Sequence, residues 1–119
     1  MKKGEEIQER VFRFACDVVA LYDDLAQRGT SAREMSRQLL RAATSIGANL
    51  HEADGAQSRA DFVSKCTIAL KEAREALYWL RLLNSTGKLN GEGEGLTHEC
   101  DRIVAVLTAI VRNTRGASA

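Results

Sequence analysis

Proline is absent from this chain of 119 residues, and phenylalanine, tryptophan and tyrosine together make up only 5% of it. Without proline, the chain has no pyrrolidine ring that would kink or break a helix interior. The scarcity of aromatic residues also removes side chains that strands favour. Alanine, leucine, glutamate and arginine are abundant, and all four are strong helix formers. The composition therefore predicts an all-α protein.

Cysteine occurs at three widely separated positions, Cys16, Cys66 and Cys100, and no CxxC pair is present. This pattern argues against a disulfide framework or a zinc knuckle. The amino-terminal sequence MKKGEEIQER contains no apolar stretch, so we expect no signal peptide. No apolar run approaches the ~18 residues that a membrane span requires. We therefore expect a cytoplasmic protein with no membrane partner.

The chain lacks an excess of charge of either sign, because 17 basic residues face 16 acidic ones. Dedicated nucleic-acid binders are usually far more basic. The distribution is uneven, however. Residues 57–88 hold six basic side chains and three acidic ones, a local net charge of +3, namely Arg59, Lys65, Lys71, Arg74, Arg81 and Lys88 against Asp61, Glu72 and Glu75.

Glycines and capping residues divide the chain into four predicted helices, at about residues 5–28, 31–55, 58–86 and 96–113. The glycine-rich residues 88–95 are expected to form a flexible loop, and residues 115–119 a frayed tail. The GEGEG run in residues 88–95 lacks the Lys-Ser/Thr pair of a phosphate-binding P-loop. A chain of this length predicts one domain, residues 1–119.

Local sequence signals mark the predicted helix ends. Ser31 with Glu34, and Ser58 with Asp61, have the spacing of a capping box at the start of the second and third helices. Gly55 is a candidate for a left-handed cap at the end of the second helix.

Apolar residues recur at alternating steps of three and four in every predicted helix. The repeats are Ile7, Val11, Phe14, Val18, Leu21 and Leu25; Leu39, Ala43, Ile46, Leu50 and Ala53; Phe62, Cys66, Ala69, Ala73, Ala76 or Leu77, and Leu80; and Leu96, Cys100, Ile103, Leu107 and Ile110. This period predicts nearly aligned helices with a left-handed twist. Short connections favour antiparallel neighbours. We therefore expect an antiparallel up-down-up-down four-helix bundle.

The first and third helices carry more apolar residues than one core stripe needs. A second stripe on the first helix contains Phe12, Ala15, Val19 and Tyr22, and the third helix adds Ile68, Trp79 and Leu82. Surplus apolar surface on a soluble protein usually indicates a partner. The residues therefore predict an oligomer interface, with a wide core face as the alternative.

Polar residues flank the apolar stripes of the second and third helices. They comprise Gln38, Arg41, Ser45, Asn49 and Glu52 on one helix, and Asp61, Lys65, Glu72 and Glu75 on the other. Antiparallel pairing about a turn near residue 56 places Arg41 opposite Glu72 and Asn49 opposite Lys65. Arginine and glutamate form a geometrically specific pair, so we predict a network that fixes helix register. A ligand or phosphate site and an ordinary solvated surface are the alternatives.

Candidate catalytic and metal sites are lacking. The only histidines, His51 and His98, have no glutamate three residues before them, as a dimetal bundle site would require. The cysteines lie at core spacing without a histidine nearby to activate a thiol. We therefore expect no enzyme activity, no metal and no cofactor.

The outer side of the third helix is basic. Lys71, Arg74 and Arg81 share it with Tyr78. Basic groups beside an exposed aromatic ring can bind phosphates and stack a base. This face is therefore a candidate nucleic-acid-binding surface, and a solvated helix face is the other interpretation.

Two segments resemble a known family. Residues 38–58 read QLLRAATSIGANLHEADGAQS, and residues 65–83, which follow Phe62, read KCTIALKEAREALYWLRLL. Both resemble the four-helix-bundle proteins encoded in intervening sequences of bacterial 23S ribosomal RNA genes. The family pattern falls on eight positions: Arg41, Ser45, Asn49, Glu52, Lys65, Glu72, Glu75 and Trp79.

The resemblance implies a homopentamer, with five bundles in a ring around a channel, and no catalytic residues. A more remote similarity is to the accessory protein of diversity-generating retroelements, which binds nucleic acid and the reverse transcriptase. The near-neutral charge of this chain departs from that protein. The expected function is thus a homo-oligomeric scaffold that binds another protein or a nucleic acid, with nucleic-acid binding by the third helix as the alternative.

Overall fold

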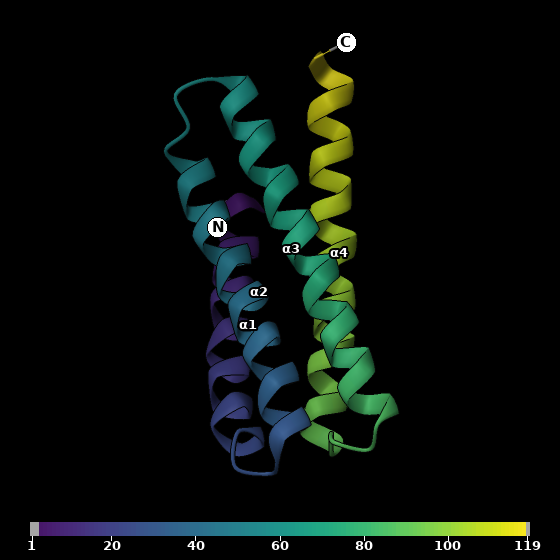
Figure 1. The fold of residues 1–119 in the computed structure, drawn as a ribbon. Coiled ribbons are helices and arrows are strands. Elements are labelled where there is room, and N and C mark those ends of the chain that lie inside the picture. Colours follow the sequence, from purple (N-terminus) through teal and green to yellow (C-terminus); the bar gives the residue numbers. More distant parts are fainter. Residues whose placement is uncertain (1–2, 119) are drawn as a thin grey trace.

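The computed structural model describes residues 3–118, and over these residues it contains four helices and no strand. They are α1 (Lys3–Leu25), α2 (Thr30–Asp54), α3 (Arg59–Ser85) and α4 (Gly91–Ser118). The helices lie side by side, with connections at alternating ends, in a body of 48 × 24 × 21 Å (Figure 1). The all-α prediction is confirmed. No described helix combines the length and apolarity that crossing a membrane would require.

The core consists of most of the predicted apolar stripes together with buried residues outside them, among them Leu70, Leu83 and Val111. Its largest fully buried side chains come from all four helices and include Phe14, Leu39, Leu80 and Leu107. Four members of the predicted stripes, Leu21, Phe62, Leu96 and Ile110, are only half-buried and pack against this core, as does Leu77, the predicted alternative to Ala76. Burying one large apolar side chain contributes roughly 1.5–3 kcal/mol. The helices are therefore held together mainly by these stripes.

The α1–α2 connection differs from the prediction. α1 ends at Leu25 rather than at residue 28, because Gln27 and Arg28 turn back in bonds to Asp24 and Leu25, three residues earlier. Gly29 then caps α2 with a φ of 130°, a conformation that favours glycine.

The predicted capping box of α2 is wrong. α2 begins at Thr30, so Ser31 lies inside its first turn, and no side chain caps the helix. The carboxylate of Glu34 forms an ion pair with Arg37 instead. Gly55 is not left-handed either, because its φ is −99° and α2 closes with bonds of Gly55 to Glu52 and Ala56 to Ala53.

The ends of α3 follow the predicted signals closely. Ser58 Oγ accepts a bond of 3.0 Å from the backbone N–H of Asp61, as the capping box requires. The Asp61 carboxylate accepts one from Gln57 N–H at 3.3 Å, one residue earlier than predicted. The helix ends at Ser85. Gly87, with a φ of 74°, allows Lys88 N–H to reach the Leu83 carbonyl in a Schellman motif.

α4 is longer than predicted at both ends. It begins at Gly91, so the predicted loop 88–95 is wrong from residue 91 onward. Asn90 Oδ1 caps the helix by accepting bonds from the N–H groups of Glu92 at 3.1 Å and Gly93 at 3.4 Å. Acidic Glu92 and Glu94 in the first turn favour this start electrostatically.

The predicted frayed tail is also wrong, because α4 continues to Ser118. Neither proline nor a capping motif stops the helix after Asn113. Arg115 lies in its last turn, where a cation is favourable. Residues 1, 2 and 119 of the predicted domain and tail lie outside the described residues.

Candidate functional site

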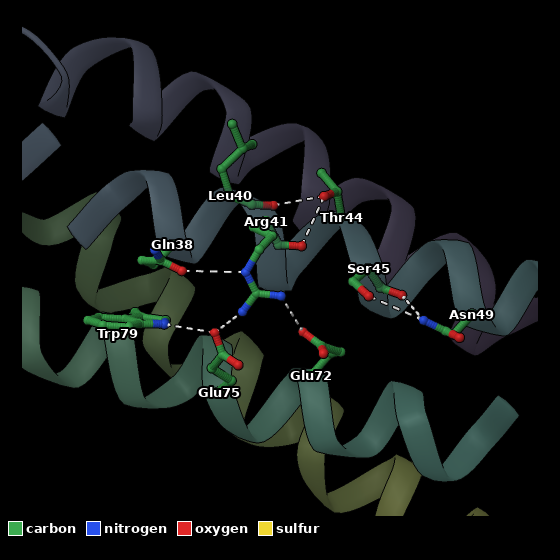
Figure 2. Close-up of polar contacts among 9 residues, drawn as sticks. All are labelled: Gln38, Leu40, Arg41, Thr44, Ser45, Asn49, Glu72, Glu75 and Trp79. Carbon is green, nitrogen blue, oxygen red and sulfur yellow. Dashed lines mark hydrogen bonds and ion pairs between the residues drawn. The ribbon is translucent and has the colours of Figure 1, made fainter. Parts of the chain in front are cut away.

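Arg41 lies at the centre of a polar network between α2 and α3 (Figure 2). Its Nη1 donates to Glu72 Oε2 at 3.2 Å, and its Nη2 donates to Glu75 Oε2. The Nε group faces Gln38 Oε1 at 3.4 Å. Trp79 Nε1 donates to the same Glu75 oxygen at 3.1 Å. The predicted Arg41–Glu72 pair is therefore present, and Glu75 with Trp79 extends it.

This network is partly shielded from solvent. The side chain of Glu72 is 14% exposed, whereas that of Arg41 is 48% exposed. The hydrogen bond from the Trp79 indole lowers the pKa of Glu75 most, and the contact with Arg41 lowers it further. Together they outweigh partial burial, which acts to raise this pKa. The hydrogen bond to Glu75 in turn raises the pKa of Arg41. The arrangement thus favours the charged form of both groups.

The remaining polar residues form a separate pair of contacts. Lys65 Nζ bonds to Glu52 Oε1 at 3.3 Å. The amide of Asn49 donates to the Ser45 carbonyl at 2.9 Å and to its hydroxyl at 3.2 Å, within α2 (Figure 2). Lys65 thus bonds to Glu52, one turn further along α2 than the Asn49 that the predicted register places opposite it, and a carboxylate is the stronger partner for an ammonium group.

No catalytic constellation assembles around these side chains. Each carboxylate of Glu52, Glu72 and Glu75 holds an ion pair. Within residues 3–118, no three His, Cys, Asp or Glu side chains lie close enough to hold a metal ion. Burial raises the pKa of Cys66, and it raises that of Cys100 to about 12. These two thiols are therefore protonated near neutral pH.

The basic face of α3 continues onto α4. Lys71, Arg74 and Arg81 are exposed, and so is Tyr78, whose ring packs edge-on against Trp79 with centroids 5.2 Å apart. Lys71 and Arg74 line a groove together with Arg112 and Arg115 of α4, whereas Arg81 lies outside it. The sequence interpretation missed both α4 arginines: Arg115 fell in the predicted frayed tail, and Arg112, inside the predicted fourth helix, was not grouped with the α3 cations. Their spacing of three residues, which places both side chains on one side of a helix, could have indicated a basic pair on α4.

The surplus apolar residues divide into exposed and half-buried positions. Phe12 is 63% exposed, Val19 44% and Ile68 39%. The other four predicted interface residues, Ala15, Tyr22, Trp79 and Leu82, are half-buried. Trp79 packs against the core, which fits the wide-face alternative for this residue. α1 and α3 pack on α2 and α4 rather than on each other, so the two apolar sets lie apart.

Comparison with known proteins assigns the family. The family model described as 23S rRNA-intervening sequence protein matches residues 3–109. A crystal structure from Bacteroides thetaiotaomicron, of a protein with unknown function from the S23 ribosomal protein family, is 41% identical, with a TM-score of 0.84. The match covers 93% of this chain and 99% of that one. No curated protein matches the sequence. The chain therefore belongs to the 23S rRNA-intervening sequence protein family.

Proposed function

We propose that this protein is a non-enzymatic homo-oligomeric scaffold that binds a macromolecular partner in the cytoplasm. Each subunit would be one antiparallel up-down-up-down bundle with a left-handed twist, spanning residues 1–119. The resemblance described above suggests a pentameric ring. The observation that carries the proposal is the exposed apolar stripe on α1, where Phe12 is 63% and Val19 44% exposed.

The stripe gives self-association a driving force. Because Phe12 and Val19 are 63% and 44% exposed, burying the remainder against a second subunit would contribute about 1–2 kcal/mol for Phe12 and under about 1 kcal/mol for Val19. Ile68 offers a further exposed apolar group on α3, a helix that does not contact α1. Two different surfaces on one subunit suit a head-to-tail contact, which closes into a ring when the rotation permits. This arrangement supports a ring over a two-fold dimer.

The engagement of the polar side chains supports a non-enzymatic role. A general base needs a carboxylate or imidazole free to take a proton. Glu72 and Glu75 are both held by Arg41, and Glu52 is held by Lys65.

Light scattering coupled to size-exclusion chromatography tests the scaffold proposal. We expect a mass of several chains at micromolar concentration. Val19→Glu should dissociate the assembly while circular dichroism stays helical, because it places an unpaired charge in a packed interface. Ala20→Glu adds the same charge at an exposed neighbouring position and should keep the assembled mass. A wild-type mass of one chain would refute self-association.

A second candidate function is nucleic-acid binding through the basic face of α3. It is favoured by the exposure of Lys71, Arg74, Tyr78 and Arg81 along one side of that helix. Gel-shift titrations against structured RNA, single-stranded DNA and duplex DNA test it. Binding should weaken steeply as salt rises. Simultaneous change of Lys71, Arg74 and Arg81 to glutamate should abolish binding. Retained binding by an intact triple variant would exclude this face.

A further inference from the structure

The groove between α3 and α4 concentrates positive charge from two helices. Four of its lining side chains are cations: Lys71 and Arg74 from α3, and Arg112 and Arg115 from α4. Its lining contains no acidic residue within the described part of the chain. Leu70 and Val111, which are 9% and 5% exposed, also line it. The groove therefore combines exposed cations with an apolar base.

The groove cations differ from several others on the bundle in their partners. Arg10, Arg28, Arg37, Arg41 and Lys65 each form an ion pair with a carboxylate. Among residues 3–118, none of the four groove cations has an ion pair. Lys71 helps to lower the pKa of Glu75, but Arg41 and Trp79 already hold that carboxylate. The positive charge of the groove is thus left for an external anion.

The two helices hold these cations at matched spacing. Lys71 and Arg74 are one helical turn apart, as are Arg112 and Arg115, which places each pair about 4.5 Å apart along its helix axis. Arg115 Nη2 donates to Thr67 Oγ1 of α3 at 3.4 Å, so its side chain reaches across the groove. An anion in the groove can accordingly receive hydrogen bonds from both helices at once.

The α3 side of the groove leads to an aromatic ring. Tyr78 lies one turn beyond Arg74 and is 58% exposed, and its contact with Trp79 restrains its ring. Arg81 follows one turn later. From Lys71 to Arg81 the helix rises about 15 Å, the length of roughly four nucleotides of a strand stacked as in a B-form duplex. Cations flanking an aromatic platform are typical of sites that bind single strands.

We propose that the α3–α4 groove binds the phosphate backbone of a single-stranded nucleic acid, with Arg112 and Arg115 supplying contacts equal in number to those of Lys71 and Arg74. A base next to the groove stacks on Tyr78. Single strands are the fitting ligand because only an unpaired base leaves its face free to stack. The inference rests on the second candidate function and adds α4 to its surface.

Fluorescence anisotropy of the full chain with a labelled 20-nucleotide oligo(dT) or oligo(U) tests the groove. The decisive variant is Arg112→Gln/Arg115→Gln, in which both positions are exposed, so that folding should be unaffected. Arg13→Gln/Arg102→Gln is the matched control, since it removes the same charge from exposed positions outside the groove. Circular dichroism and light scattering confirm that both variants retain their fold and assembly.

We expect the α4 variant to bind about tenfold or more weakly at ~50 mM salt, with the magnitude of its log–log salt slope reduced by about 1.4, the value for two lost phosphate contacts on a single strand. The control should keep the wild-type affinity within about threefold and the wild-type slope. Tyr78→Leu should weaken binding by about tenfold through lost stacking and leave the slope unchanged.

The outcomes separate this inference from the function on which it rests. If the α4 variant keeps the wild-type slope while Lys71→Gln/Arg74→Gln loses binding, the groove inference is wrong and nucleic-acid binding by α3 stands. If the wild type binds neither oligonucleotide nor a duplex, both are wrong. Tighter binding to a 20-base-pair duplex than to the single strands would overturn the single-strand specificity.

Discussion

Replacing Arg41 with methionine tests whether the α2–α3 network stabilises the bundle. The change keeps an unbranched side chain but leaves Glu72, which is only 14% exposed, without its cation. Breaking an exposed ion pair costs about 0.2–1 kcal/mol, whereas stranding a fully buried charge costs about 3–5 kcal/mol. Since Arg41 itself is 48% exposed, we expect a loss between these limits, about 1–2 kcal/mol.

Thermal and urea unfolding at one fixed protein concentration provide the measurement, because assembly makes apparent stability depend on concentration. A loss of this size corresponds to a decrease in Tm of roughly 4–8 °C for a chain of this length. Arg37→Met is the matched control. Its ion pair with Glu34 lies within α2, with side chains that are 56% and 61% exposed, so its loss should cost clearly less than Arg41→Met.

A double-mutant cycle with Glu72→Leu isolates the contact between the helices. The double variant should recover part of the loss, which gives a coupling energy of about 0.5–1.5 kcal/mol. If the two single effects simply add, or if Arg41→Met costs no more than Arg37→Met, Arg41 does not fix the α2–α3 register.

Protonation of Glu75 should also reveal the network. The pKa of Glu75 is lowered in the folded state by Trp79 first and Arg41 second. Its contribution to stability is therefore fully present above the unfolded value of 4.5 and is lost as pH falls through the lower folded pKa. The difference in unfolding free energy between wild type and Glu75→Gln should accordingly be largest at neutral pH and shrink below about pH 4. A difference that stays constant down to pH 3 would contradict this assignment.

Two further predictions concern packing. Gly95→Ala should stabilise α4 by about 0.5–1 kcal/mol, because a Cβ there meets no atom within 4 Å. Gly93→Ala should instead destabilise the protein by roughly 1–3 kcal/mol, because its Cβ would lie 2.8 Å from Leu89 Cβ. Equal Tm shifts for the two variants would contradict this packing. In the native protein at pH 8, no more than one thiol, Cys16, should react rapidly with a thiol reagent, while all three should react after unfolding, because Cys66 and Cys100 are buried with raised pKa values. Rapid reaction of two thiols would indicate local opening of the core.

The core and the Arg41–Glu72 pair were predictable because both depend on periodicity. A spacing of three and four residues places Val11, Phe14 and Val18 on one side of α1 whatever the details of its ends. Once two long helices are antiparallel, the position of one turn fixes which residues face each other. An error of one residue in that turn shifts the partner by less than one helical turn, and a long arginine side chain tolerates this.

The helix ends were harder to predict because several weak local signals compete there. Five glycines and glutamates from residue 91 to residue 95 indicate a loop by propensity alone. The cap supplied by Asn90, the acidic first turn and the fit of Gly93 against Leu89 outweigh that propensity. Ser31 does not cap α2 because Gly29, with its positive φ, occupies the N-cap position two residues earlier.

The positions of the two proposed surfaces determine whether assembly and binding can coexist. The apolar stripe lies on α1, and the basic groove lies between α3 and α4; α1 and α3 pack on other helices rather than on each other. An interface that buries Val19 therefore need not cover Arg112 or Arg115, although the partner surface at Ile68 on α3 lies one turn from Lys71 at the edge of the groove. A single groove with four cations makes few phosphate contacts and should bind weakly. An assembly repeats the groove once per subunit, and a strand long enough to span two grooves meets the second at a high effective concentration. Oligomerisation would thus turn a weak site into a useful one without adding any contact within the subunit.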